Sequence, residues 1–238
     1  MKKNRSFFVT GTDTEVGKTL VSGALILKLR QLGLQVAGFK PVVAGTYLDD
    51  SGNKLNEDLE TLRMAAGPLS FELTLCPYVL DQPVAPHIAA YTQAIELESV
   101  HIQEAFQKIY SQFDAVVVEG AGGFLVPLND HDDLGDIAQT MGLPIILVVG
   151  MRLGCINHAL LTCEALQSRH LPIAGWVANT LFDEMPLINK NILALKNRIS
   201  APFLGLIPTL PKHLQKFANA PYSLEALEFA AQHLNLPR

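Results

Sequence analysis

A glycine-rich segment near the start of the chain, residues 11–19, carries a lysine and a threonine in the sequence GTDTEVGKT. It follows the apolar run Phe7–Val9 and precedes a helix-like apolar stretch that begins at Leu20. A tight turn between a strand and a helix directs backbone N–H groups and the positive end of the helix dipole at one point, which favours phosphate. In such a loop Lys18 can reach the β- and γ-phosphates of a nucleotide, and Thr19 can bind Mg²⁺. The segment therefore predicts a site for a nucleoside triphosphate.

The spacing of this segment departs from the usual phosphate-binding pattern, in which a glycine stands five residues before the second glycine. Thr12 occupies that position here, and the glycine comes one residue earlier, at Gly11. A chance Gly-Lys-Thr in a turn is the alternative interpretation. The strand before the turn and the helix after it favour the nucleotide site.

Two charged residues end apolar runs that are typical of strands. Lys40 ends the run Gln35–Lys40, where it is either a solvated surface lysine or a cation that neutralises a phosphoryl group in transfer. Glu119 follows four apolar residues in Ala115–Glu119. Burying this carboxylate is costly without a partner such as a divalent metal, and the alternative is a side chain that reaches solvent.

A third acidic residue, Asp58, lies at the start of a predicted helix, where it either caps the helix or binds a metal. Asp49, Asp50 and Glu57 are nearby competitors for the second role. Together, Thr19, Asp58 and Glu119 would give Mg²⁺ three hard oxygen ligands.

Two asparagines complete the candidates. Asn157 either caps a helix or lies beside free N–H groups that receive a carboxylate. Asn179 ends a predicted strand and either makes a turn or reads the edge of a base. Three histidines, His87, His101 and His158, are interpreted as structural because they lack metal-like spacing and a nucleophile partner.

The composition limits the class of protein. The 238 residues are 49% hydrophobic with a formal net charge of −5, which argues against a nucleic-acid surface. The longest apolar run, Leu143–Val149, is too short to span a bilayer, and no signal peptide is evident. Three cysteines without a Cys-x-x-Cys pair suggest free thiols in a reducing cytoplasm. We expect a cytoplasmic protein whose residues 1–238 form a single domain.

Apolar runs alternate with helical periodicity along the chain, which predicts an α/β fold with a mostly parallel sheet and helices on both faces. The predicted strands are Phe7–Thr10, Gln35–Lys40, Ala115–Glu119, Pro144–Val149, Ile173–Ala178 and Phe203–Ile207. The predicted helices are Thr19–Gln31, Asp58–Ala66, Ser99–Gln112, Asn157–Ser168, Pro186–Arg198 and Ser223–Leu234. Residues 45–57 are interpreted as a mobile loop and residues 67–87 as irregular. Ligands of such a sheet bind beyond the carboxyl ends of its strands.

With these residues assembled, the chain resembles the dethiobiotin synthetase family of the P-loop NTPase superfamily. The resemblance covers nearly the whole chain and rests on Val9–Thr19, Gly38–Val42, Val118–Gly123, Leu153–Ala159, Ala174–Asn179 and Leu204–Pro208. It implies a homodimeric, Mg²⁺- and ATP-dependent ligase that acts on 7,8-diaminononanoate and CO₂. The reaction would pass through a carbamate and a phosphorylated carbamate before the second amine closes the ureido ring.

The resemblance also implies roles for individual residues. The nucleotide would contact Glu15, Val16, Gly17, Lys18, Thr19, Leu20, Asp58, Glu119, Gly120, Ala121, Gly122, Asn179, Pro208, Thr209 and Leu210. Mg²⁺ would be bound by Thr19, Asp58 and Glu119. Lys40, Lys18 and Thr14 would act in catalysis, with Lys40 also contacting the substrate. Gly154, Cys155, Ile156 and Asn157 of the other subunit would receive the substrate's carboxylate.

One departure from the family pattern concerns the substrate. Some members place a hydroxyl residue where this chain has Ala44. Either Thr46 or a backbone group takes over that contact, or the contact is missing. Residues 48–54 and the tail after Pro211 match the family only weakly.

Two alternatives share parts of this pattern. A partition-type switch ATPase would usually carry a second lysine near residues 11–14, where this chain has none. An amide-forming ligase of cobalamin synthesis would normally add a glutaminase domain, for which no length remains.

Overall fold

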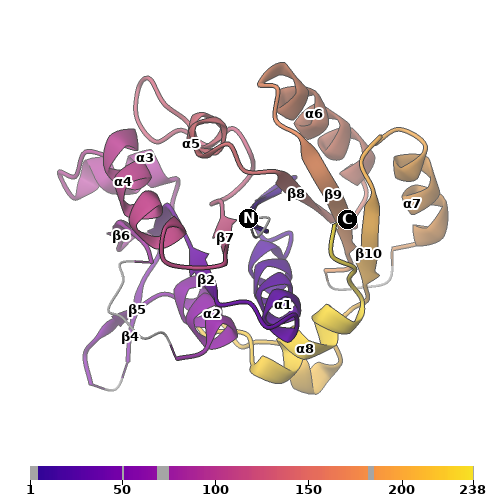
Figure 1. Ribbon diagram of the computed structural model, residues 1–238, viewed down its shortest axis with the longest axis horizontal. Coiled ribbons are helices and arrows are strands. Elements are labelled where there is room, and N and C mark those ends of the chain that lie inside the picture. Colours follow the sequence, from indigo (N-terminus) through magenta and orange to yellow (C-terminus); the bar gives the residue numbers. More distant parts are fainter. Residues whose placement is uncertain (1–4, 50, 69–74, 182–184, 238) are drawn as a thin grey trace.

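A six-stranded parallel sheet lies at the centre of the protein (Figure 1). The computed structural model describes residues 5–49, 51–68, 75–181 and 185–237. The strand order is β10-β9-β8-β1-β7-β2. The strands are β1 (Phe7–Gly11), β2 (Val36–Phe39), β7 (Ala115–Glu119), β8 (Ile145–Gly150), β9 (Ile173–Asn179) and β10 (Phe203–Ile207). Each predicted strand is confirmed, and no end shifts by more than one residue.

Helices cover both faces of this sheet, as predicted. Figure 1 shows α1 (Lys18–Gln31), α2 (Glu57–Ala66) and α8 (Leu224–Gln232) on one side of it. The other side carries α3 (Pro86–Thr92), α4 (Ser99–Tyr110), α5 (Leu134–Met141), α6 (Cys155–Ser168) and α7 (Ile188–Lys196). Within the described residues, no helix is long and apolar enough to cross a membrane.

The central strands are apolar on both sides because alternate residues enter different cores. Phe7 and Val9 of β1 pack in the cluster that contains Leu25 of α1. Phe8, between them, packs in the cluster that contains Phe106 of α4 and Ile137 of α5. Burial on two faces therefore removes the alternation of polar and apolar residues that a half-exposed strand would show.

Two segments, one predicted as a mobile loop and one as irregular, contain regular structure. Residues 45–57 hold an antiparallel hairpin of β4 (Tyr47–Leu48) and β5 (Lys54–Leu55). In the segment 67–87, β6 (Tyr78–Leu80) pairs in parallel with β3 (Val42–Ala44), and α3 begins at Pro86. Residues 69–74 of that segment lie outside the described residues. Strands of two or three residues are too short for a periodic signal, and proline at the first turn of a helix is easily interpreted as a loop.

At the helix ends, the interpretations of Asp58 and Asn157 as N-caps and the predicted helix start at Pro186 were wrong. Asn56, not Asp58, caps α2 and accepts hydrogen bonds from the N–H groups of Asp58 and Leu59. Gly154 rather than Asn157 is the N-cap of α6, and α7 follows the N-cap Leu187 rather than starting at Pro186. By contrast, Gly33 lies just after α1 with a φ of 80°, as its predicted position requires.

Helix α5 was not predicted, and its start is fixed by side chains from two parts of the chain. Asp133 caps α5 and forms a capping box with Asp136. Arg169, just after α6, donates to both oxygens of Asp133 at 2.5 and 2.7 Å and lies over the ring of Phe124. The bidentate contact joins the end of α6 to the start of α5. The contact with Phe124 adds the loop that follows Glu119.

The three cysteines, Cys76, Cys155 and Cys163, are buried and free. Burial raises the pKa of each thiol, to about 12 for Cys76 and about 11 for Cys163. The free thiols agree with the prediction from their number and spacing.

Candidate active site

The glycine-rich loop between β1 and α1 has the compact shape that its sequence predicts. Glu15 and Gly17 both have positive φ angles, 57° and 89°. A Cβ atom on Gly17 would lie 2.1 Å from Nδ2 of Asn179, and the same Nδ2 donates to the carbonyl of Val16 at 2.9 Å. The end of β9 therefore holds this loop, and only glycine fits at residue 17.

Lys18 lies folded within this loop. Its ammonium donates to the carbonyl of Asp13 at 3.0 Å, and the residue is buried. Burial, together with the positive charge of Lys40, lowers the pKa of Lys18 to about 8. Thr14 lies at the exposed side of the loop, where a Cβ on Gly122 would be 3.5 Å from its hydroxyl oxygen. The loop after β7 thus approaches the glycine-rich loop closely.

Four side chains from four elements or loops meet beside this loop. Lys40, just after β2, places its Nζ 2.7 Å from Oε1 of Glu119 and 2.8 Å from Oδ2 of Asp58. The hydroxyl of Thr19 lies 2.7 Å from Oδ1 of Asp58 and 2.7 Å from Oε1 of Glu119. Lys40 is 2% exposed and Glu119 is fully buried. The interpretation of Lys40 as a solvated lysine is therefore wrong, as is that of Glu119 as a carboxylate reaching solvent.

The positive charge of Lys40 and the negative charges of Asp58 and Glu119 stabilise one another. Burial alone would lower the pKa of Lys40, but the negative charges of Asp58 and Glu119 outweigh it and raise the pKa above its usual value. Burial would raise the pKa of Asp58, but Lys40 and the Thr19 hydroxyl lower it to about 2. Burial raises the pKa of Glu119, an effect that Lys40 opposes and Asp58 reinforces. Lys40 is therefore an ammonium group at neutral pH.

The oxygen atoms of the cluster fit a magnesium ion. One hydroxyl and two carboxylates are hard ligands of the kind that Mg²⁺ takes alongside phosphate and water oxygens. Oε2 of Glu119 is buried and has no hydrogen-bond partner among the described residues. No group of three or more His, Cys, Asp or Glu side chains in the described part of the chain forms a metal site. Thr19, Asp58 and Glu119 would therefore be the side-chain ligands of a metal here, with phosphate or water oxygens as its further ligands.

Unsatisfied polar atoms also mark the predicted base site. Oδ1 of Asn179 and Oγ1 of Thr209 are buried without a hydrogen-bond partner in the described residues. Asn179 is paired in register with Ile207, directly before Pro208–Leu210. The structure thus brings together the two strand ends that were predicted to hold the nucleotide. A buried acceptor without a donor is unfavourable unless a ligand supplies one.

The remaining predicted residues lie in several elements. Leu20 is buried in the first turn of α1. Gly120, Ala121 and Gly122 follow Glu119, and the carbonyl of Gly120 accepts from Lys40 at 3.4 Å. Ala44 ends β3. Residues 154–157 start α6, and no side-chain hydrogen bond or ion pair among the described residues joins them to the lysine cluster.

Sequence patterns did not reveal two ion pairs near the site. Arg152, before α6, pairs with Asp13 of the glycine-rich loop. Lys216, after β10, lies 2.5 Å from Glu57 of α2. The partners are more than a hundred residues apart, so no local spacing could have identified them.

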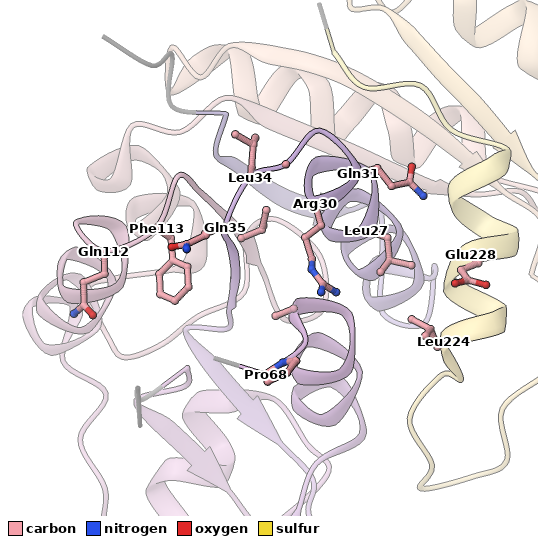
Figure 2. A pocket seen from close by; sticks show the side chains of 13 residues that line it. Leu27, Arg30, Gln31, Leu34, Gln35, Pro68, Gln112, Phe113, Leu224 and Glu228 are labelled. Carbon is pink, nitrogen blue, oxygen red and sulfur yellow. The ribbon is translucent and has the colours of Figure 1, made fainter. Parts of the chain in front are cut away.

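A cavity of about 630 Å³ lies away from these residues (Figure 2). It is formed where α1, α2 and α4 end and β2 begins, at the amino edge of the sheet. Figure 2 shows Arg30 near its centre, with Leu27, Gln35 and Phe113 around it. None of the residues predicted to bind nucleotide, metal or substrate lines it.

Comparisons with known proteins show the fold and the family of this chain. A family model described as an AAA domain matches residues 5–216. A ParA family ATPase from Chlorobium tepidum has a similar fold, with a TM-score of 0.58 and 16% identity over 97% of this chain and 90% of that one. At that identity the similarity shows the fold alone.

Two relatives are much closer in sequence. The ATP-dependent dethiobiotin synthetase BioD of Ralstonia nicotianae is 49% identical over 205 residues, which cover 86% of this chain and 89% of that protein. The enzyme of the same name from Aromatoleum aromaticum is 49% identical over 211 residues, covering 87% and 92%. Because this identity extends over most of both chains, the chain belongs to the ATP-dependent dethiobiotin synthetase family of enzymes.

Proposed function

We propose that this chain is a Mg²⁺-dependent ligase that uses ATP to close the ureido ring of dethiobiotin from 7,8-diaminononanoate and CO₂. The proposal extends to this chain the activity in the names of its relatives. The observation that carries it is the buried Lys40, held between Asp58 and Glu119 beside a glycine-rich phosphate loop. The arrangement supplies charge for phosphoryl transfer, and the substrate itself provides the nucleophile in this reaction.

The nucleotide would lie across the carboxyl ends of β1, β7 and β9. Backbone N–H groups of residues 15–20 would hold the phosphates, since they start a helix after a tight turn. The unpaired Oδ1 of Asn179 would accept from the amino group of adenine, beside residues 208–210. Residues 120–122 would contact the nucleotide on the side of β7.

The proposed reaction has three bond-forming steps. One substrate amine attacks CO₂ and loses a proton, giving a carbamate. A carbamate oxygen then takes the γ-phosphoryl group of ATP and releases ADP. The second amine attacks the carbonyl carbon, loses a proton and expels inorganic phosphate, which closes the ring.

The residues of this chain would act by placing charge. Lys40 and Lys18 would neutralise the oxygens of the transferred phosphoryl group and the carbamate, and Thr14 would donate a hydrogen bond from the loop. Thr19, Asp58 and Glu119 would hold Mg²⁺, which when bound neutralises phosphate charge and orients the phosphates. Ala44 provides no hydroxyl, so Thr46 or a backbone group would have to make the corresponding substrate contact.

The substrate's carboxylate would bind at residues 154–157 of a second subunit. Gly154, the N-cap of α6, has no side chain to accept from the first-turn N–H groups of the helix. Those N–H groups and the helix dipole suit a carboxylate. Leu153, next to them, is 96% exposed, which agrees with an interface in a homodimer. We place the reaction in the cytoplasm, to which three free thiols are suited.

An assay with mass detection tests the proposal. The purified chain is incubated with ATP, Mg²⁺, bicarbonate and 7,8-diaminononanoate, and dethiobiotin, ADP and phosphate are measured. We expect equal amounts of the three products and no dethiobiotin when any one component is omitted. ATP hydrolysis that ignores the diamine, with no dethiobiotin formed, would contradict the proposal.

A further inference from the structure

The ammonium of Lys40 contacts the same two carboxylates that the proposed function assigns to Mg²⁺. Its Nζ lies 2.8 Å from Asp58 and 2.7 Å from Glu119, while the hydroxyl of Thr19 lies 2.7 Å from each of the same carboxylates. A threonine hydroxyl has a single proton and cannot donate fully to both. Two carboxylates thus contact the Lys40 ammonium, and the Thr19 hydroxyl joins the same two carboxylates.

A second cation in this space would meet strong repulsion. The side chain of Lys40 is 3% exposed and that of Glu119 is 0% exposed, so water screens their charges little. Two carboxylates balance one ammonium with one negative charge left over, but they do not balance an ammonium and a divalent ion together. Oε2 of Glu119, buried and without a partner in the described residues, is the oxygen still available to a metal.

From these contacts, and resting on the proposed function, we infer that Lys40 and Mg²⁺ compete for Asp58 and Glu119. Metal binding displaces the Lys40 ammonium from the carboxylates, and the displaced group is then available to the phosphoryl group and the carbamate. The carbonyl of Gly120 lies 3.4 Å from Nζ in the loop after β7. It can accept a hydrogen bond from the displaced side chain. Lys40 is thus a catalytic residue that becomes available only after the metal has bound.

Binding of Mn²⁺ alone to the nucleotide-free, full-length protein tests this competition. Free Mn²⁺ is measured by electron paramagnetic resonance during a titration of wild type, Lys40→Met and Lys40→Arg. We expect Lys40→Met to bind Mn²⁺ about tenfold more tightly than wild type or better, because one buried positive charge is removed. Lys40→Arg keeps the charge and should stay within about threefold of wild type.

Lys18→Met is the matched control for general loss of positive charge. Lys18 is also buried, but its Nζ donates to the carbonyl of Asp13 rather than to either carboxylate. Direct competition predicts a smaller gain for Lys18→Met than for Lys40→Met. Equal gains in the two variants, or no gain in Lys40→Met, would overturn the inference.

A second measurement uses the wild type and does not depend on how the variants fold. Acetylation of Lys40 by a small amine-reactive reagent is followed by mass spectrometry with and without Mn²⁺. We expect slow acetylation without the metal and an increase of about fivefold or more with it, normalised to exposed Lys54. An unchanged rate would contradict the displacement.

If Lys40→Met folds only when Mn²⁺ is added, that result also supports competition.

The ligase assay separates this inference from the proposed function. Dethiobiotin formation by wild type, together with unchanged Mn²⁺ affinity in Lys40→Met, would refute the competition and leave the ligase. Tighter Mn²⁺ binding in that variant without dethiobiotin formation by wild type would refute the ligase and leave the competition.

Discussion

At the scale of single residues, the site depends on buried charges that neutralise one another. Removing one member of such a set leaves an uncompensated charge, which costs more than the pair itself contributes. A substitution of Lys40 tests the role of its charge in catalysis. A substitution of Gly17 tests the backbone shape of the phosphate loop beside it.

Replacing Lys40 by alanine should slow turnover while ATP still binds in the presence of Mg²⁺. We expect kcat for dethiobiotin to fall by about 10²–10³-fold or more, because a cation aimed at the transferred group is lost. Steady-state kinetics and calorimetric ATP titration measure the two effects. Lys108→Ala, at an exposed position of α4, is the control. Near-normal kcat in Lys40→Ala would remove Lys40 from the mechanism.

Adding one methyl group to Gly17 should distort the phosphate loop. Gly17 and Gly33 both have positive φ, but a Cβ on Gly17 would lie 2.1 Å from Asn179 and one on Gly33 would meet nothing within 4 Å. We expect Gly33→Ala to lose about 1–2 kcal/mol of unfolding free energy and Gly17→Ala about 2–4 kcal/mol. Urea unfolding and ATP titration compare them, and equal losses with intact ATP binding would argue against the contact with Asn179.

At the scale of elements, the start of α5 is stabilised by the positive charge of Arg169, which lies outside the sequence of that helix. Asp133 caps α5 and is bound by Arg169, which follows α6. Burial alone would raise the pKa of Asp133, but Arg169 and backbone N–H groups overcome it and keep the pKa below its usual value. Because the folded-state pKa is depressed, the stabilisation is present above the unfolded pKa and is lost as pH falls through the folded one.

The variant Asp133→Asn tests this charge while keeping a good helix cap. At pH 7 we expect it to be less stable than wild type by about 1 kcal/mol. That difference should shrink below about pH 4, where the unfolded carboxyl of wild type takes up a proton. Urea unfolding at pH 7, 5 and 3.5 measures it, with exposed Asp130→Asn as the control. A difference independent of pH would point to shape rather than charge.

Long helices and strands could be predicted from the sequence. Very short strands, and contacts between residues far apart in the chain, could not. The six strands of the sheet and six of the helices follow from apolar runs and helical periodicity, whereas β3–β6 are too short to show a period. Lys40 and Glu119 could be named because each ends an apolar run at the ligand edge. Their partnership with each other, and that of Asp133 with Arg169, depends on residues brought together only by folding.

At the scale of the whole molecule, the single domain and the homodimer stay predictions. The homodimer can be tested through the site that its subunits would share. In a shared site, Lys40 of one subunit would act with residues 154–157 of its partner. Lys40→Ala and Asn157→Asp should each be nearly inactive, the second because a carboxylate would repel the substrate's carboxylate. Mixed dimers would contain one site in which both residues are intact.

Mixing the two inactive proteins in equal amounts, with time for subunits to exchange, should restore about one quarter of wild-type activity, since half the dimers are mixed and half their sites are intact. Light scattering measures the oligomeric state, and each variant incubated alone is the control. No recovery after demonstrated exchange would mean that each site is complete within one subunit.

The burial of all three cysteines has a practical consequence. Thiols that are covered and hold their protons at neutral pH react slowly with maleimides. A cysteine introduced at Ser51, between the strands of the exposed β4–β5 hairpin, could therefore carry a fluorophore without replacement of the native three. Movement of that hairpin during turnover could then be followed optically in an otherwise natural chain.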